Sequence, residues 1–160
     1  SGIHGAVGVD VSLDALEVAQ NNKDINNVPY VELIQSDMFE ALEGSGMKFD
    51  VIVSNPPYIP TRVIKGLDEE VRLHDPFIAL DGDEDGLKFY RIITDKARDY
   101  LNKDGYLCYE IGHDQAAKVS DILSSYGYND IRVIKDLAGL DRVVVARYYG
   151  TSVGSGRYNI

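Results

Sequence analysis

The sequence predicts an α/β fold with a mostly parallel, doubly wound sheet. Short apolar runs alternate with amphipathic helical segments through most of the chain, and two strand-like runs come last with no helix between them. Alternating strands and helices give parallel strands with helices on both faces. The final two runs predict an antiparallel hairpin at the edge of that sheet. A chain of 160 residues is long enough for one domain with a real core.

The first half of the chain carries three strand patterns, each followed by polar residues. Ser12 is a good helix N-cap and Asp14 suits the first helical turn, so a helix is expected after the first strand. The expected elements are a strand over residues 6–10, a helix from Ser12 to about Asn21, a strand over 30–34, a short helix over 39–42 and a strand over 51–54.

The second half begins with a long, charge-rich stretch, residues 59–86. Such a stretch is typical of a binding loop, a lid or disorder, and only residues 68–73 favour a helical turn. Gly105 is expected to lie in a turn that separates the preceding helix from the next strand. The later elements are a helix over 87–101, a strand over 106–111, a helix over 114–125 and strands over 129–135 and 142–147.

Composition and charge restrict the partners of this chain. The net charge is −10 and the charged residues are scattered, so no basic patch favours direct binding to nucleic acid. No apolar run approaches the length of a membrane span, and no secretory signal is visible. The single cysteine, Cys108, permits no intrachain disulfide and is expected to be a buried structural thiol. We therefore expect a cytoplasmic protein that has no membrane partner. We also expect it to be a monomer.

The segment Asn55-Pro56-Pro57-Tyr58 is the strongest candidate site. Proline has no backbone N–H, so two prolines end strand pairing and hold the preceding carboxamide of Asn55 at the carboxyl end of a strand. Ligands bind at that end of open α/β sheets. The Asn55 side-chain oxygen and neighbouring carbonyls can accept both hydrogens of an NH2 group, while Tyr58 offers a ring face. The alternative is an ordinary turn, which Asn-Pro and Pro-Pro pairs commonly mark.

Two acids follow the two earlier strands. Asp10 can accept hydrogen bonds from both hydroxyls of a ribose, and a helix cap or a solvated strand end is an equally good interpretation. Asp37 can accept from an adenine amino group with Met38 packing on the ring, or it can belong to a simple loop turn. Together with Asn55, these acids would line one edge of the sheet, where a nucleoside could lie.

Several segments resemble the HemK/PrmC family, the glutamine methyltransferases that act on peptide chain release factors. The resemblance covers residues 6–149. The matching segments are Val9-Asp10-Val11-Ser12-x-Asp14-Ala15-Leu16, Gln35-Ser36-Asp37-Met38-Phe39, Asn55-Pro56-Pro57-Tyr58-Ile59-Pro60, Asp75-Pro76-x-x-Ala79-Leu80, Asp85-Gly86-Leu87-x-Phe89-Tyr90-Arg91-Ile92, Glu110-Ile111-Gly112-x-x-Gln115 and Asp136-Leu137-Ala138-Gly139-x-Asp141-Arg142-Val143.

The resemblance implies a seven-stranded, Rossmann-like methyltransferase sheet that binds S-adenosylmethionine and releases S-adenosylhomocysteine. It implies that Asp10 binds the ribose and that Asp37 and Met38 lie beside the adenine. It further implies that Asn55 to Tyr58 hold the substrate glutamine amide, with Asn55, Pro56 and Tyr58 in the catalytic role and a release factor as the protein substrate.

Family members also carry a helical N-terminal domain and a first strand that ends in a glycine-rich loop. This sequence opens with Ser1-Gly2-Ile3, essentially at the second strand, so that strand and loop are expected to be absent from it. Residues 1–149 are then the catalytic domain, and residues 150–160 are a disordered tail or a tail foreign to the natural sequence.

Two other functions stay open at this point. One is an amino-group methyltransferase acting on adenine or guanine in DNA or RNA, which uses a segment similar to Asn55-Pro56-Pro57-Tyr58. The other is a non-catalytic fragment. His4, His74 and His113 lack metal-ligand spacing, so no metal is expected. Glu110 is as easily a structural acid as a site residue. The acids of the long loop are a solvated surface or a contact for a basic protein substrate: Asp68, Glu69, Glu70, Asp81, Asp83, Glu84 and Asp85.

Overall fold

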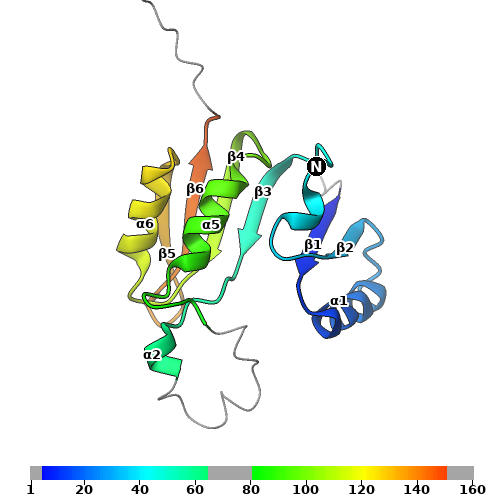
Figure 1. Cartoon of the computed structure of the whole chain (residues 1–160), viewed down its shortest axis with the longest axis horizontal. Coiled ribbons are helices and arrows are strands. Elements are labelled where there is room, and N and C mark those ends of the chain that lie inside the picture. Colours follow the sequence, from blue (N-terminus) through cyan, green and yellow to red (C-terminus); the bar gives the residue numbers. More distant parts are fainter. Residues whose placement is uncertain (1–4, 65–80, 151–160) are drawn as a thin grey trace, which may run out of the picture. The chain divides into compact units, whose positions relative to one another are not determined.

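The computed structural model describes residues 5–64 and 81–150, which belong to two compact units, residues 1–47 and 48–160. The first unit contains β1 (Ala6–Asp10), α1 (Leu13–Ile25), β2 (Val31–Gln35) and the short 3-10 helix η1 (Glu40–Leu42). The second contains β3 (Phe49–Ser54), α2 (Thr61–Ile64), α5 (Lys88–Ala97), β4 (Leu101–Glu110), α6 (Ala116–Ser125), β5 (Asn129–Lys135) and β6 (Asp141–Tyr148) (Figure 1).

The first unit is built on a parallel pair of strands. β1 and β2 run side by side, and Asp10 at the end of β1 pairs with Gln35 at the end of β2. Helix α1 begins where the sequence predicts it, because the Ser12 hydroxyl accepts a hydrogen bond from the Ala15 amide at 3.2 Å. The helix continues to Ile25, beyond the predicted end near Asn21.

The second unit is a four-stranded sheet with the order β3-β4-β6-β5. β3 and β4 are parallel, whereas β6 is antiparallel to both β4 and β5. The predicted hairpin at the edge of the sheet is therefore confirmed, with β5 outermost. β1 and β2 are parallel, and in the second unit β3, β4 and β5 run in one direction while only β6 is reversed. The strands therefore match the predicted fold class of a mostly parallel sheet.

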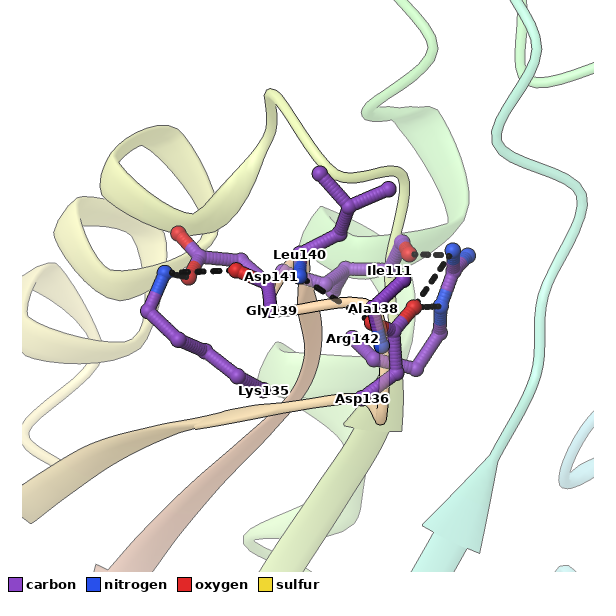
Figure 2. Close-up of polar contacts among 8 residues, drawn as sticks. All are labelled: Ile111, Lys135, Asp136, Ala138, Gly139, Leu140, Asp141 and Arg142. Carbon is purple, nitrogen blue, oxygen red and sulfur yellow. Dashed lines mark hydrogen bonds and ion pairs between the residues drawn. The ribbon is translucent and has the colours of Figure 1, made fainter.

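The turn of this hairpin is held by the carboxylate of Asp136 (Figure 2). It accepts hydrogen bonds from the amides of Ala138 at 2.9 Å and Leu140 at 3.0 Å, and it pairs with the guanidinium of Arg142 at 3.2 Å. Arg142 also donates to the carbonyl of Ile111 at 3.4 Å, directly after β4. The turn between β5 and β6 is thus tied to the end of the neighbouring strand.

The core of the second unit lies between the sheet and helices α5 and α6, which stand together on one face of it (Figure 1). Tyr90 of α5 and Tyr109 of β4 are fully buried and meet edge to face with ring centroids 5.1 Å apart. The Tyr109 hydroxyl lies 2.9 Å from that of Thr94, and Tyr128 donates to the Thr94 carbonyl at 3.1 Å. Burial raises the pKa of Tyr90 and Tyr109. Their hydroxyls are therefore neutral hydrogen-bonding groups.

Two boundaries in the second unit differ from the prediction. The helix predicted over 87–101 ends at Ala97, and Leu101 already belongs to β4. Gly105 does not precede β4 but lies inside it, at an irregularity where the pairing with β3 jumps from Leu101 to Tyr106. Apolar periodicity cannot locate this boundary, because Leu101 fits the apolar side of the predicted helix and yet belongs to β4.

Other expectations are settled more simply. The strand over 129–135 has the predicted bounds, and the charge-rich stretch contains the unpredicted helix α2. The predicted turn over 68–73 and most of the predicted tail lie outside the described residues.

Cys108 is half-buried rather than buried, and desolvation raises the pKa of its thiol. Within residues 5–64 and 81–150, no helix has the length and apolar character to cross a membrane.

Candidate active site

The Asn55–Tyr58 corner follows β3 directly. Ser54 is the last residue of β3 and pairs with Tyr109 of β4, after which the two prolines end the ladder. Asn55 is exposed, Pro56 is buried, and Pro57 and Tyr58 are half-buried. The structure thus confirms that Asn55 and the two prolines directly follow the carboxyl end of a strand, and it adds that Asn55 is exposed there.

The chain that follows residue 80 supports this corner. Ile59 and Asp81 form an isolated parallel bridge, and the Gly82 amide donates to the Ile59 carbonyl at 2.9 Å. The Thr61 amide donates to the Asp83 carbonyl at 3.0 Å, and the Thr61 hydroxyl donates to the Asp81 carboxylate at 2.6 Å. The two ends of the charge-rich stretch therefore lie side by side, and together they fix the exit from the corner.

Two glycines allow this close approach. A Cβ on Gly82 would lie 2.9 Å from the Pro57 carbonyl oxygen, and one on Gly86 would lie 2.4 Å from the Tyr58 carbonyl oxygen. Gly86 also has φ +73, a conformation that favours glycine. The sequence pattern indicates only that both are loop glycines. Their packing against the Asn55–Tyr58 corner is seen only in the structure.

Several acids of the loop have structural partners. Asp83 pairs with Lys88 at 3.2 Å, and Asp85 pairs with Arg91 at 2.5 Å and accepts from the Leu87 amide at the start of α5. A hydrogen bond from the Glu84 amide lowers the pKa of Asp83, and Lys88 adds a smaller effect in the same direction. Arg91 lowers the pKa of Asp85. Both acids still lie at the surface, with about half of each side chain exposed, so they are solvated and also have structural partners. Asp68, Glu69 and Glu70 lie outside the described residues.

Three of the loop acids also line a hollow in the second unit, which has a volume of about 400 Å³. Its lining residues are Asp83, Glu84, Asp85, Lys88, Arg91 and Ile92, so the Asn55–Tyr58 corner is not part of it. Because four of its charged groups pair with one another, this hollow is a weaker candidate site than the corner.

Asp10 ends β1 and is exposed. One of its carboxylate oxygens accepts from the Ser12 amide at 2.8 Å, and its backbone carbonyl accepts from the Ser36 amide at 3.0 Å. The alternative of a cap at the start of α1 is therefore partly realised, because one oxygen binds the amide of the N-cap residue Ser12. A carboxylate has acceptor sites on both oxygens, so ribose binding is compatible with this turn and stays a prediction.

Asp37 and Met38 lie in the loop after β2. Asp37 is exposed, while Met38 is half-buried and has φ +47. The buried Ser36 holds this backbone, because its hydroxyl donates to the Met38 carbonyl at 3.0 Å and accepts from the Ala41 amide at 3.0 Å. A left-handed non-glycine residue is uncommon and often marks a functional site.

The structure brings together Asp10, Asp37 and Met38, which lie at the carboxyl end of the parallel pair in the first unit. Asn55 to Tyr58 belong to the second unit. The predicted line from the two acids to Asn55 along one sheet edge stays a prediction. His4 and His74 lie outside the described residues, His113 is exposed, and residues 5–64 and 81–150 contain no metal-binding cluster of His, Cys, Asp or Glu.

Residues 3–126 match the family described as methyltransferase small domain. The chain belongs to this family. Solved methyltransferases share the fold: a methyltransferase from Pyrococcus furiosus has a TM-score of 0.65 at 22% identity and covers 92% of this chain and 64% of its own. The ribosomal protein L11 methylase from Lactobacillus delbrueckii has a TM-score of 0.60 at 17% identity, with coverage of 92% and 60%.

Curated relatives of this methyltransferase domain are more similar in sequence. The release factor glutamine methyltransferase of Agrobacterium fabrum is 46% identical over 142 residues, which is 88% of this chain and 48% of the relative. That of Clostridium acetobutylicum is 44% identical over 138 residues, with coverage of 86% and 48%. The chain therefore spans about half the length of the curated relatives that it matches.

Proposed function

We propose that this methyltransferase domain transfers a methyl group from S-adenosylmethionine to the side-chain amide nitrogen of a glutamine in a peptide chain release factor. The observation that carries the proposal is the exposed Asn55 carboxamide, held by Pro56 and Pro57 at the carboxyl end of β3. The similarity to release factor glutamine methyltransferases supports a glutamine amide as the group that this corner receives. The expected setting is the cytoplasm, with the protein monomeric and without direct contact to nucleic acid.

The chemistry requires positioning more than acid–base catalysis. An amide nitrogen is a poor nucleophile because its lone pair is delocalised into the carbonyl. The Asn55 side-chain oxygen and the Pro56 carbonyl would accept the two amide hydrogens and hold the nitrogen in line with the methyl group. These acceptors bind more strongly as positive charge develops on the nitrogen, which stabilises the transition state selectively. The proton then leaves to water.

The residues of the first unit fit an adenosyl group. Asp10 can hold its turn through one oxygen and accept from ribose hydroxyls through the other. Asp37 is exposed beside a backbone that Ser36 fixes, so it can accept from the adenine amino group while Met38 packs on the ring. When bound, the sulfonium supplies an activated methyl group, and the product is S-adenosylhomocysteine.

We expect that Asn55→Ala lowers methyl transfer to release factor by at least about a hundredfold, because a hydrogen bond that strengthens in the transition state is lost. The affinity for S-adenosylmethionine, measured by calorimetry, should not change. Asn21→Ala, at an exposed position of α1, serves as the control and should keep full activity. Near-normal methylation by the Asn55→Ala variant would contradict the proposal.

A further inference from the structure

We propose that Gln115 is a positioning residue that holds the Asn55–Tyr58 corner in its substrate-binding orientation. The inference rests on the proposed function, since it treats the corner as the place where the amide is held. Gln115 itself is buried, with 6% of its surface exposed, so it acts through the corner and not on the substrate.

The side chain of Gln115 links three separate backbone segments. Its amide nitrogen donates to the carbonyl of Tyr58 at 3.0 Å and to the carbonyl of Gly86 at 3.3 Å. Its oxygen accepts from the amide of Gly112 at 3.0 Å. Both donors and the acceptor are therefore engaged, which fixes the orientation of the carboxamide. A flipped amide would place oxygen against two carbonyls.

Each of these segments meets the carboxyl end of the sheet. Tyr58 follows β3, Gly112 follows β4, and Gly86 precedes α5. Only Pro56 and Pro57 separate Tyr58 from Asn55, and their rings restrict the backbone between the two residues. Fixing the Tyr58 carbonyl therefore restricts the position of the Asn55 carboxamide.

The placement of Gln115 is not explained by its own helix. It occupies the N-cap position of α6, yet its side chain makes no capping hydrogen bond. Its backbone carbonyl accepts from the amide of the buried Val119 at 3.0 Å, which anchors it to the core. Because the side chain does not cap its own helix but binds the carbonyls of Tyr58 and Gly86, it has a role in positioning those segments.

Two glycines make room for this side chain. A Cβ on Gly86 would lie 2.9 Å from the Gln115 amide nitrogen, and a Cβ on Gly112 would lie 2.9 Å from its oxygen. Neither distance is compatible with a normal contact. The absence of a side chain at Gly112 therefore leaves room for the oxygen of the Gln115 carboxamide, and its absence at Gly86 leaves room for the nitrogen.

Two variants separate the donors from the rest of the side chain. Gln115→Glu keeps the shape and the acceptor for Gly112, but turns a carboxylate oxygen towards the carbonyls of Tyr58 and Gly86. Gln115→Met keeps the length and removes every polar partner. The matched control is Tyr128→Phe, which removes the buried hydrogen bond to the Thr94 carbonyl away from the corner. All three changes remove buried hydrogen bonds. Gln115→Met and Tyr128→Phe only remove polar partners and so differ mainly in place, whereas Gln115→Glu also buries a carboxylate against two carbonyls.

The decisive measurement is amide hydrogen exchange of the full chain by NMR at Thr61. The Thr61 amide donates to the Asp83 carbonyl, one of the hydrogen bonds that hold the chain after the Asn55–Tyr58 corner. Loss of a hydrogen bond that fixes this segment should raise exchange there about tenfold in both Gln115 variants. Tyr128→Phe should leave exchange at Thr61 unchanged. In methyl-transfer kinetics, kcat should fall about tenfold or more while KM changes little, because positioning is lost rather than binding.

The two proposals can fail separately. If the wild-type chain methylates no release factor, the proposed function fails, and exchange alone then decides the role of Gln115. The inference about Gln115 is overturned if both variants keep wild-type exchange at Thr61. It is also overturned if their kcat falls no more than that of Tyr128→Phe.

Discussion

Gly86 shows at the scale of one residue how an absent side chain shapes the candidate site. Its backbone has φ +73, and any Cβ would lie 2.4 Å from the Tyr58 carbonyl oxygen. The loop can approach the corner only because this position is glycine. The sequence shows the glycine itself, but its partner is known only once the loop and the corner are seen together.

We expect Gly86→Ala to destabilise the chain by about 2–5 kcal/mol, because it combines backbone strain with a steric clash. Gly127 is the matched control in the same unit, since it has φ +86 but no atom lies within 4 Å of the place that its Cβ would take. Gly127→Ala should cost about 1–2 kcal/mol from strain alone. Urea denaturation measures both values, and equal costs would refute the close packing at Gly86.

Prediction from sequence was strongest at single positions with a local signature. Two adjacent prolines after an apolar run predicted the corner at Asn55, and Ser12 predicted the start of α1; the structure confirms the position of both. The structural partners of Asp83 and Asp85 were missed. Asp83 and Asp85 lie in the loop before α5, so no spacing along one helix indicates their pairing with Lys88 and Arg91.

At the scale of elements, the hairpin of β5 and β6 carries a charge-dependent turn. The Leu140 amide, then Arg142, and then the Ala138 amide lower the pKa of Asp136 (Figure 2). A carboxylate whose folded pKa lies below its unfolded value stabilises the fold above the unfolded value of about 4. That contribution is lost as the pH falls through the folded pKa.

We therefore expect the free energy of unfolding of the wild type to decrease as the pH falls below about 4, and to decrease less in Asp136→Asn. Urea denaturation between pH 2 and about 7 measures this difference. Asp121→Asn, at an exposed position of α6, is the control and should follow the wild type. Parallel pH profiles for Asp136→Asn and the wild type would show that the turn does not depend on the charge of Asp136.

Element boundaries were less predictable than element types. The apolar period of α5 continues through Tyr100 and Leu101, so periodicity extended the helix to residue 101. In the structure, Leu101 pairs with Phe49 of β3 and begins β4. This outcome depends on a strand that lies about fifty residues earlier in the sequence, which no local pattern can include. Helix α2 was missed for a different reason, since its four residues are too few for a period.

At the scale of the whole molecule, the alternation of strands and helices predicted the fold class, and the shared fold of solved methyltransferases agrees with it. The order β3-β4-β6-β5 could not be predicted from the sequence. The insertion of the antiparallel β6 between β4 and β5 depends on how the whole sheet packs, which no local pattern shows. The arrangement of Asp10, Asp37 and Asn55 along one edge likewise depends on packing between distant segments, and it stays a prediction.

The charge of the whole molecule also bears on its substrate. A net charge of −10 disfavours a phosphate backbone as the main partner, whereas a protein substrate carries no such requirement. The similarity to release factor glutamine methyltransferases favours the same choice. A corner that accepts an NH2 group could in principle receive an amide or a nucleobase, so the identity of the methylated atom is the central question.

The most direct test is to incubate the full chain with S-adenosylmethionine carrying a labelled methyl group, together with release factor, RNA and DNA, and to locate the label by mass spectrometry. The proposal predicts the label on the side-chain nitrogen of a release factor glutamine, and its loss in Asn55→Ala. Label on a nucleobase, or no transfer to release factor by the wild-type chain, would contradict it.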